Sequence, residues 1–277
     1  AELLRSVWRA TSTDQVINFG LLRALEHSGN YVAGAFAGDR LIGCCVAVFG
    51  AGYLHSHITG VDRRLQCKGI GFALKQHQRA WALARGIAMV RWTFDPLVRR
   101  NAHFNLHKLG ATASEYLPDF YGPMDDGINT GDASDRLMAD WQLTSARAVG
   151  AAHGACVDAD EVVRGARVTT LLDRVDGKPL RRGYPAPGQR DGRVSPLAPP
   201  RVADAGPGRV LLVALPMDIE TLRVSDRRLA DRWRHEVRAA LTGALDRGYR
   251  IVGVTRHGCY VLVREPEEVP ADATDRP

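Results

Sequence analysis

Apolar positions in the first half of the chain switch repeatedly between helical and strand periodicity. Val16, Phe19, Leu22 and Leu25 recur at helical spacing after two candidate capping residues, which predicts a helix over 14–28. Apolar runs rich in β-branched and aromatic residues predict strands, and two further segments have helical spacing. The predicted strands are 31–37, 41–49, 53–61, 87–94, 111–117 and 136–143, and the other predicted helices are 69–84 and 99–109. This order predicts a mixed α/β domain.

The composition changes after Leu143, which predicts a boundary between regions. Much of the chain from there to about residue 208 is rich in Gly, Pro and Arg and resembles a loop, although 168–173 can add one strand. A strand, a long helix and two strands are then predicted, and this βαββ order is similar to that of 53–94 without its glycine-containing turn. The acidic, Pro-rich end predicts disorder. The predicted regions are 1–144, a linker or arm at 145–208, a smaller βαββ unit at 209–265 and a disordered tail at 266–277.

The positive charge of the chain comes almost entirely from arginine. The 277 residues have a formal net charge of +6, and the only lysines are Lys68, Lys75, Lys108 and Lys178. Basic and acidic residues are interleaved, and no DNA-binding or RNA-binding motif is present, so we expect no nucleic-acid partner. Arginine forks suit phosphate, and a modest positive excess fits a nucleotide cofactor that carries several phosphates.

No segment of the sequence has the pattern of a membrane span, a signal peptide or a metal site. Apolar runs stay well short of the roughly 18 residues that a spanning helix needs, so we expect a cytoplasmic protein without a membrane partner. The five cysteines form no CxxC pair, which predicts free thiols. His103 and His107 have metal-ligand spacing but no accompanying third ligand, so no metal is expected.

The turn between the predicted strand 53–61 and the predicted helix 69–84 has the features of a phosphate-binding site. It contains Gly69 and Gly71, with Lys68 beside them. Backbone N–H groups at a helix N-terminus are unpaired and lie at the positive end of the helix dipole, and glycine lets an anion approach them closely. The segment is therefore predicted to bind phosphate, although Gly-x-Gly alone is also common in ordinary turns.

The pattern Val-x-x-x-x-Gln-x-x-Gly-x-Gly at 61–71 resembles motif A of the GNAT superfamily of N-acetyltransferases. The runs 54–61, 92–97 and 100–106 resemble a bacterial branch of it, and the resemblance covers about 1–144. It implies a mostly antiparallel, twisted sheet flanked by helices, with acetyl-CoA or another acyl-CoA as cosubstrate. The cofactor-binding residues that it implies are Thr59, Gly60, Val61, Gln66, Cys67, Lys68, Gly69, Ile70, Gly71 and Asn101.

Candidate catalytic residues lie on the same strand and in a downstream loop. Two-residue alternation places His55, His57, Thr59 and Val61 on one face and Ser56 and Ile58 on the other. His57 is the predicted base, and the alternative is an ordinary half-buried sheet histidine. Leu106 stands where the resemblance implies a tyrosine acid. Tyr121 and Tyr116 are therefore the candidate acids, with aromatic packing as the alternative for each.

Two functions fit this sequence. One is an N-acetyltransferase that transfers an acetyl group from acetyl-CoA to a primary amine of a small molecule, by direct attack in a ternary complex. With this function the C-terminal unit completes the substrate pocket or forms a homodimer. The alternative is a catalytically weak acyl-CoA-binding or interaction module with a GNAT-like fold.

Overall fold

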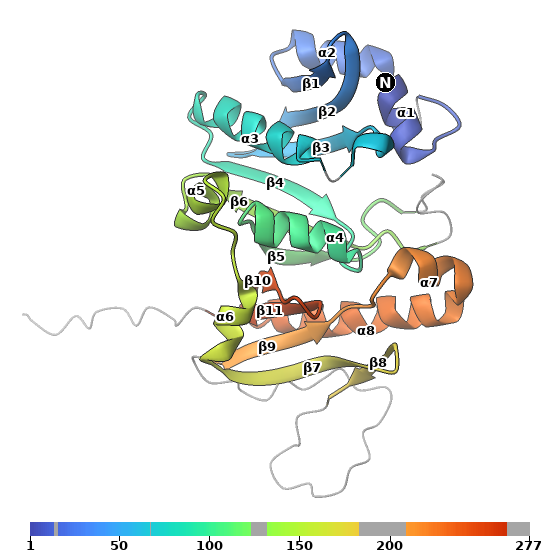
Figure 1. The fold of residues 1–277 in the computed structure, drawn as a ribbon, viewed down its shortest axis with the longest axis vertical. Coiled ribbons are helices and arrows are strands. Elements are labelled where there is room, and N and C mark those ends of the chain that lie inside the picture. Colours follow the sequence, from blue (N-terminus) through green and yellow to red (C-terminus); the bar gives the residue numbers. More distant parts are fainter. Residues whose placement is uncertain (14–15, 67, 123–131, 183–208, 265–277) are drawn as a thin grey trace, which may run out of the picture.

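The computed structural model describes residues 1–13, 16–66, 68–122, 132–182 and 209–264. Its strands form one continuous 11-stranded mixed sheet in the order β1-β2-β3-β4-β6-β5-β10-β11-β9-β7-β8. Most neighbouring strands are antiparallel, and the parallel pairs are β3 with β4 and β7 with β9. Figure 1 shows the N-terminal strands at one end of the molecule and β7 and β8 at the other. The predicted fold class is confirmed.

The N-terminal half follows the predicted order closely. Its strands are β1 (Tyr31–Ala37), β2 (Arg40–Phe49), β3 (Leu54–Val61), β4 (Met89–Phe94), β5 (Thr112–Leu117) and β6 (Arg136–Gln142). Its helices are α1 (Glu2–Trp8), α2 (Phe19–His27), the short 3₁₀ turn η1 (Arg63–Leu65), α3 (Ile70–Leu83), α4 (Arg99–Ala102) and the π-helical η2 (His103–Lys108).

The first predicted helix was placed too early. α2 begins at Phe19, because the Asn18 side chain accepts hydrogen bonds from the backbone N–H groups of Gly20 and Leu21. Phe19 is 69% exposed, so its helical spacing did not mark a core position. The preceding helix α1 was not predicted, and its Leu4 packs in a small core with Ile17.

The region expected as a linker or arm is folded over its described part. The segment 145–182 forms α5 (Ala146–Ala152), α6 (Ala159–Arg164), β7 (Arg167–Val175) and β8 (Lys178–Arg181). β7 contains the strand suggested at 168–173, and its Leu171 and Leu172 are buried, which explains why this stretch joins the sheet. The segment 183–208 and the predicted disordered tail lie outside the described residues.

The C-terminal unit has the predicted βαββ order, with the helix divided in two. Its elements are β9 (Arg209–Ala214), α7 (Ile219–Ser225), α8 (Arg227–Leu245), β10 (Arg250–Val254) and β11 (Cys259–Val263). The long helix that the sequence predicts corresponds to α8, and α7 precedes it. Asp226 separates the two helices and caps α8 by accepting from the Leu229 N–H.

Helices cover the two faces of the sheet unequally. Cys45 packs in one core with Leu74 of α3, whereas its neighbour Val46 packs with Leu4 of α1, so α3 and α1 lie on opposite faces. The α3 core continues through η2 and α8 along the whole sheet. On the opposite face α6 packs against β11 through Ala159 and Val261.

The C-terminal unit resembles the second half of the N-terminal unit rather than 53–94. The order β4-β6-β5 in one half matches β9-β11-β10 in the other. In each set a helix follows the first strand, β4 or β9, along the chain. That strand also has a parallel neighbour on its other side, which is β3 for β4 and β7 for β9. The halves meet where β5 pairs antiparallel with β10, at Ala113 and Ile251. The corresponding strands β5 and β10 therefore form the centre of the sheet (Figure 1).

Candidate functional site

The parallel strands β3 and β4 separate after a short pairing. Only two residue pairs join them, Leu54 with Val90 and His55 with Arg91, although both strands continue for several residues. The corresponding strands β7 and β9 pair at five positions. The N-terminal half therefore has an opening in its sheet that the C-terminal half lacks, with unpaired backbone groups on both sides.

A β-bulge at His57 changes which side chains of β3 share a face. Val46 of β2 pairs with Ile58 and the next residue pairs with Ser56, so His57 is the extra residue. Ser56 and Thr59 consequently both approach the Cys45 sulfur on the α3 side, at 3.9 and 3.1 Å. The predicted alternation was wrong here, because a bulge breaks the two-residue period that it assumed.

The predicted phosphate-binding turn lies beyond the end of β3, at the start of α3. Gly69 precedes the helix with φ +83°, a conformation that favours glycine. A Cβ atom at Gly71 would make only ordinary contacts, at 3.8 Å or more, so the approach to the helix amides is open. The side chains of Arg63, Arg64 and Lys68 are exposed and form no ion pair within the described part of the chain. These features suit a phosphate group.

The remaining predicted cofactor residues lie around this turn and the opening. Thr59, Gly60 and Val61 form the part of β3 that has left β4, and Gln66 and Ile70 flank the turn. Cys67 lies outside the described residues.

Asn101 and Leu106 lie on the helical segment after β4. Asn101 is half-buried in α4. The following π-helix η2 is wider than an α-helix and shifts the faces of its residues. Leu106 is fully buried, while the neighbouring Asn105 accepts a hydrogen bond from the Trp92 indole at 3.2 Å. The position expected for a tyrosine thus belongs to the core.

Polar side chains gather on the face of the sheet opposite α3, beside the opening. His55 and His57 lie with their ring centroids 6.2 Å apart. Across the opening, the Tyr121 hydroxyl and the Thr93 hydroxyl of β4 are 2.9 Å apart. Tyr121 is 41% exposed, so a solute can reach it. The structure therefore brings His57 and Tyr121 to the two sides of the opening, as candidate proton-transfer groups.

Charged groups of both signs lie on the same face. Arg91 of β4 forms an ion pair with Asp140 of β6 at 2.7 Å and a longer one with Glu115 of β5 at 3.7 Å. Asp140 also accepts a hydrogen bond from Ser114. Arg136 of β6 lies on this face as well, with its guanidinium 5.1 Å from the centroid of the Tyr121 ring, so two guanidiniums accompany the two carboxylates.

Tyr116 lies elsewhere. Its hydroxyl donates to Asp135 at 2.5 Å, and Arg238 of α8 binds the same carboxylate. Burial, followed by the charge of Asp135, raises the pKa of Tyr116 far above its usual value. The structure therefore places this predicted acid in a buried contact between β5 and α8, away from His57.

The two histidines of β3 favour the neutral form. Burial lowers the pKa of His57. Burial also lowers the pKa of His55, with further contributions from the positive charges of His57, Lys75 and Arg91. His57 is more than a third exposed, so solvent limits the effect, but its direction suits a base that accepts a proton near neutral pH.

Sequence reasoning missed a buried polar cluster on the α3 side of the opening. Lys75 donates to Ser56 at 2.7 Å and to Gln78 at 3.2 Å, and Gln78 donates to the Cys45 sulfur at 3.3 Å. The available signal was that Lys75 and Gln78 lie on the apolar stripe of α3 together with Leu74. A lysine on such a stripe indicates a buried charge.

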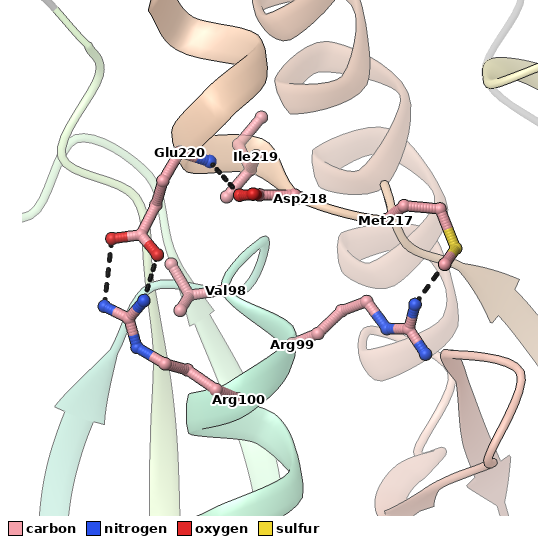
Figure 2. Close-up of a pocket in the computed structure, with 7 residues that line it drawn as sticks. All are labelled: Val98, Arg99, Arg100, Met217, Asp218, Ile219 and Glu220. Atoms are coloured by element: carbon pink, nitrogen blue, oxygen red, sulfur yellow. Dashed lines mark hydrogen bonds and ion pairs between the residues drawn. The ribbon is translucent and has the colours of Figure 1, made fainter. Parts of the chain in front are cut away.

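A small pocket of about 240 Å³ lies away from this site, between α4 and α7 (Figure 2). Arg100 pairs with Glu220 across it, Arg99 donates to the Met217 sulfur at 3.1 Å, and Asp218 caps α7. Its polar groups satisfy one another, so the pocket belongs to the contact between the two halves.

The described residues contain neither a metal-binding cluster nor a membrane-spanning helix. No group of three or more His, Cys, Asp and Glu side chains among them can hold a metal ion. Their helices are all too short or too polar to cross a membrane.

Comparisons with known proteins agree with the motifs. Residues 2–111 match the acetyltransferase (GNAT) family. No curated protein matches the sequence. Similar solved structures include a GNAT family acetyltransferase from Elizabethkingia anophelis with acetyl-CoA bound (16% identity, 51% of this chain and 89% of that chain, TM-score 0.42). Another is an IAA acetyltransferase from Bacillus cereus (20% identity, 51% of this chain and 91% of that chain, TM-score 0.41). A third is an N-acetyltransferase from Staphylococcus aureus (14% identity, 52% of this chain and 94% of that chain, TM-score 0.41). Residues 2–111 of this chain are thus similar in sequence to the acetyltransferase (GNAT) family.

Proposed function

We propose that this protein transfers an acetyl group from acetyl-CoA to a primary amine of a small molecule. The observation that carries the proposal is the opening between β3 and β4, which continues through the glycine turn to the N-terminus of α3. One end of this path offers helix amides and exposed cations for phosphates. The other end offers unpaired strand backbone and a face with a neutral histidine.

In this proposal the bound cofactor runs along that path. The amides at 69–71, together with Lys68 and Gln66, hold the pyrophosphate. The backbone of Thr59, Gly60 and Val61 lines the opening and contacts the pantetheine arm, and Asn101 contacts the arm from α4. Acetyl-CoA supplies the activated acetyl group as a thioester.

The acceptor amine approaches from the face opposite α3. The carboxylates of Asp140 and Glu115 are available as hydrogen-bond acceptors for the amine, and His57 takes one proton from the neutral amine during attack. Holding both substrates together makes direct attack in a ternary complex effectively unimolecular. Tyr121 lies across the opening, where it can position the acceptor by hydrogen bonding together with Thr93.

The folded C-terminal half has a structural part in this proposal. It occupies the β5 edge of the N-terminal sheet, and its own strands β7 and β9 stay paired. We therefore assign the cofactor to the N-terminal unit of about 1–144 and a supporting role to the C-terminal unit. An open edge at β5 would otherwise be available for pairing with a second copy.

The alternative function is binding of acyl-CoA without efficient transfer. It is favoured by the leucine at position 106, where the resemblance implies a tyrosine, and by the enclosure of Tyr116, because neither residue can then supply a proton to the leaving group.

Two measurements separate the two functions. Calorimetry with acetyl-CoA measures cofactor binding, and thiol release measures transfer to spermidine, tyramine, kanamycin and free lysine. Binding together with release stimulated by at least one amine supports the transferase. Binding without stimulated release by any amine supports the binding module, and the absence of binding contradicts both.

A further inference from the structure

Lys75 reaches from α3 to the point where β3 and β4 separate. Its Nζ donates to the Ser56 hydroxyl at 2.7 Å and lies 3.9 Å from the centroid of the Trp92 ring. Ser56 and Trp92 are the first residues of the two strands beyond their last pairing. The ammonium therefore lies beneath the narrow end of the opening and contacts both strands.

The charge of Lys75 has no anionic partner in the described residues. The side chain is 3% exposed, and its hydrogen-bond acceptors are the neutral groups of Ser56 and Gln78. The titratable group that faces it is Cys45 of β2, and His55 of β3 interacts with its charge from the opposite face of the sheet. Burying an ammonium without an anion is costly, and burial lowers the pKa of Lys75 to about 8. Such a group suits an anion that appears only during a reaction.

Hydrogen bonds connect this ammonium to the part of β3 that faces the proposed thioester. The bulge at His57 brings Ser56 and Thr59 onto the same sulfur, that of Cys45. Gln78 closes the cluster by bonding to both Lys75 and Cys45. The Ser56 hydroxyl therefore connects the Lys75 ammonium to the opening.

We propose that Lys75, acting through the Ser56 hydroxyl, supplies the proton that the departing coenzyme A thiolate takes up. This inference rests on the proposed transferase function. The amine nitrogen forms a bond to the acetyl carbon, and the carbon–sulfur bond breaks with its electron pair on sulfur. The nitrogen loses its proton to His57. Ser56 donates its proton to sulfur and receives one from Lys75, which solvent then reprotonates. The products are the amide and the coenzyme A thiol.

The kinetic test compares Lys75→Met, Lys75→Arg and Ser56→Ala with the parent protein, using acetyl-CoA and the best amine of the panel. The proposal predicts that kcat of the parent falls as pH rises through about 8, because Lys75 loses its proton. In Lys75→Met we expect kcat to fall about 100-fold and the alkaline decrease to vanish. The KM for acetyl-CoA should change less than about threefold, because the lost interaction acts in the transition state. Lys75→Arg keeps a charge but should not restore the decrease near pH 8.

A matched control replaces an exposed lysine far along the sheet. Lys178 lies in β8, and Lys178→Met should keep both the rate and the pH profile. Thermal melting confirms that each variant is folded. If Lys75→Met fails to fold, Lys75→Arg and Ser56→Ala still test the proposal through the pH profile.

A second measurement requires no acceptor amine. The ultraviolet absorbance of the thiolate reports the pKa of the coenzyme A thiol bound to the protein. We expect this pKa to be lower in the parent than in Lys75→Met, because the ammonium stabilises the thiolate. Coenzyme A lacking its sulfur should bind both proteins equally.

The outcomes distinguish the two proposals. Turnover by the parent, combined with an unchanged pH profile and an unchanged thiol pKa in Lys75→Met, overturns the role of Lys75 and leaves the transferase intact. A parent protein that binds acetyl-CoA but transfers to no amine overturns the transferase and, with it, this inference.

Discussion

The bulge at His57 shows how a single backbone irregularity rearranges the side chains beside the opening. It leaves His57 unpaired with β2, on the same face as His55, and brings Thr59 to the same face as Ser56. A bulge in a strand commonly re-aims a side chain next to an active site. The His57 imidazole is exposed while the strand itself stays anchored in the sheet.

The first prediction concerns His57 as a base. In His57→Gln we expect kcat to fall about 100-fold, within the range for loss of a general base. A base must be neutral, and burial lowers the pKa of His57 below 6.5, so activity of the parent should fall more steeply below that pKa than in the variant. Steady-state rates from pH 5 to 9 measure this, using His153→Gln, at the end of α5, as control. Equal acid limbs in parent and variant would contradict the assignment.

The second prediction concerns the cost of the buried charge at Lys75. Lys75→Met removes a buried ammonium, so at pH 7 we expect the free energy of unfolding to rise by about 1 kcal/mol. The folded pKa of about 8 lies below the unfolded value of 10.5, so the unfolded chain binds more protons between them. The parent should therefore gain stability as pH rises across this window, and the difference from the variant should shrink. Urea unfolding at pH 7 and 10 checks both, and a destabilised variant at pH 7 would indicate a structural role.

Individual residues of the site were predictable only where local geometry determined their role. Gly69 was singled out because two glycines lie at a predicted helix entry, and the structure places it there with positive φ, a conformation that favours glycine. The sequence did not predict which face of the sheet Thr59 and Ser56 occupy, because a bulge arises from the pairing of β3 with β2. The enclosure of Tyr116 was also missed, because Asp135 and Arg238 reach it only after the chain has folded.

At the scale of elements, the proposed cofactor site depends on the glycine turn and α3. The third prediction is that Gly71→Glu abolishes binding of acetyl-CoA, because it places bulk and negative charge at the helix N-terminus. A Cβ atom at this position meets Val61 and Phe104 at ordinary distances, so the variant should fold. Calorimetry measures the affinity, and melting checks the fold.

Gly71→Ala provides the matched control for that experiment. It adds the same Cβ atom without charge, and we expect it to weaken binding less than the glutamate does. Unchanged affinity of Gly71→Glu, in a folded protein, would show that phosphate does not bind at this turn.

Most elements were predictable because periodicity is a local property. The predicted strands and helices of the N-terminal half agree with the observed ones to within a few residues, apart from α1 and the start of α2. Capping decided the start of α2, since the Asn18 side chain begins a helix that apolar spacing had placed earlier. The π-helical turn η2 was not predictable, because its extra residue leaves no periodic signal in so short a segment.

At the scale of the whole molecule, the two halves are joined by a buried ionic cluster as well as by the sheet. Asp95, which follows β4, binds Arg234 of α8 at 3.0 Å and Arg223 of α7 at 2.5 Å. Asp132 binds the same two arginines, both at 2.6 Å. These contacts link residues about a hundred positions apart, which is why the single sequence suggested separate regions. Charge pairing at such separation leaves no local pattern.

The fourth prediction concerns this cluster. Asp95→Ala leaves two arginines with less anionic charge in a buried site, so we expect a loss of about 3–5 kcal/mol in the free energy of unfolding at pH 7. Asp231→Ala, which breaks an exposed pair with Arg227, should cost less than about 1 kcal/mol. Urea unfolding monitored by tryptophan fluorescence compares the two. Equal, small losses would show that the cluster contributes little to joining the halves.

The pH dependence gives an independent check on the same contact. Neighbouring arginines outweigh the opposing effect of burial and lower the pKa of Asp95 to about 2, compared with 3.8 for the free group. A lowered pKa in the folded state means that this contribution is complete above the unfolded value and is lost as pH falls toward 2. The parent and Asp95→Ala should therefore differ most in stability near neutral pH and converge at low pH. If they instead differ equally at pH 7 and pH 2, the loss arises from the packing of the side chain and not from its charge.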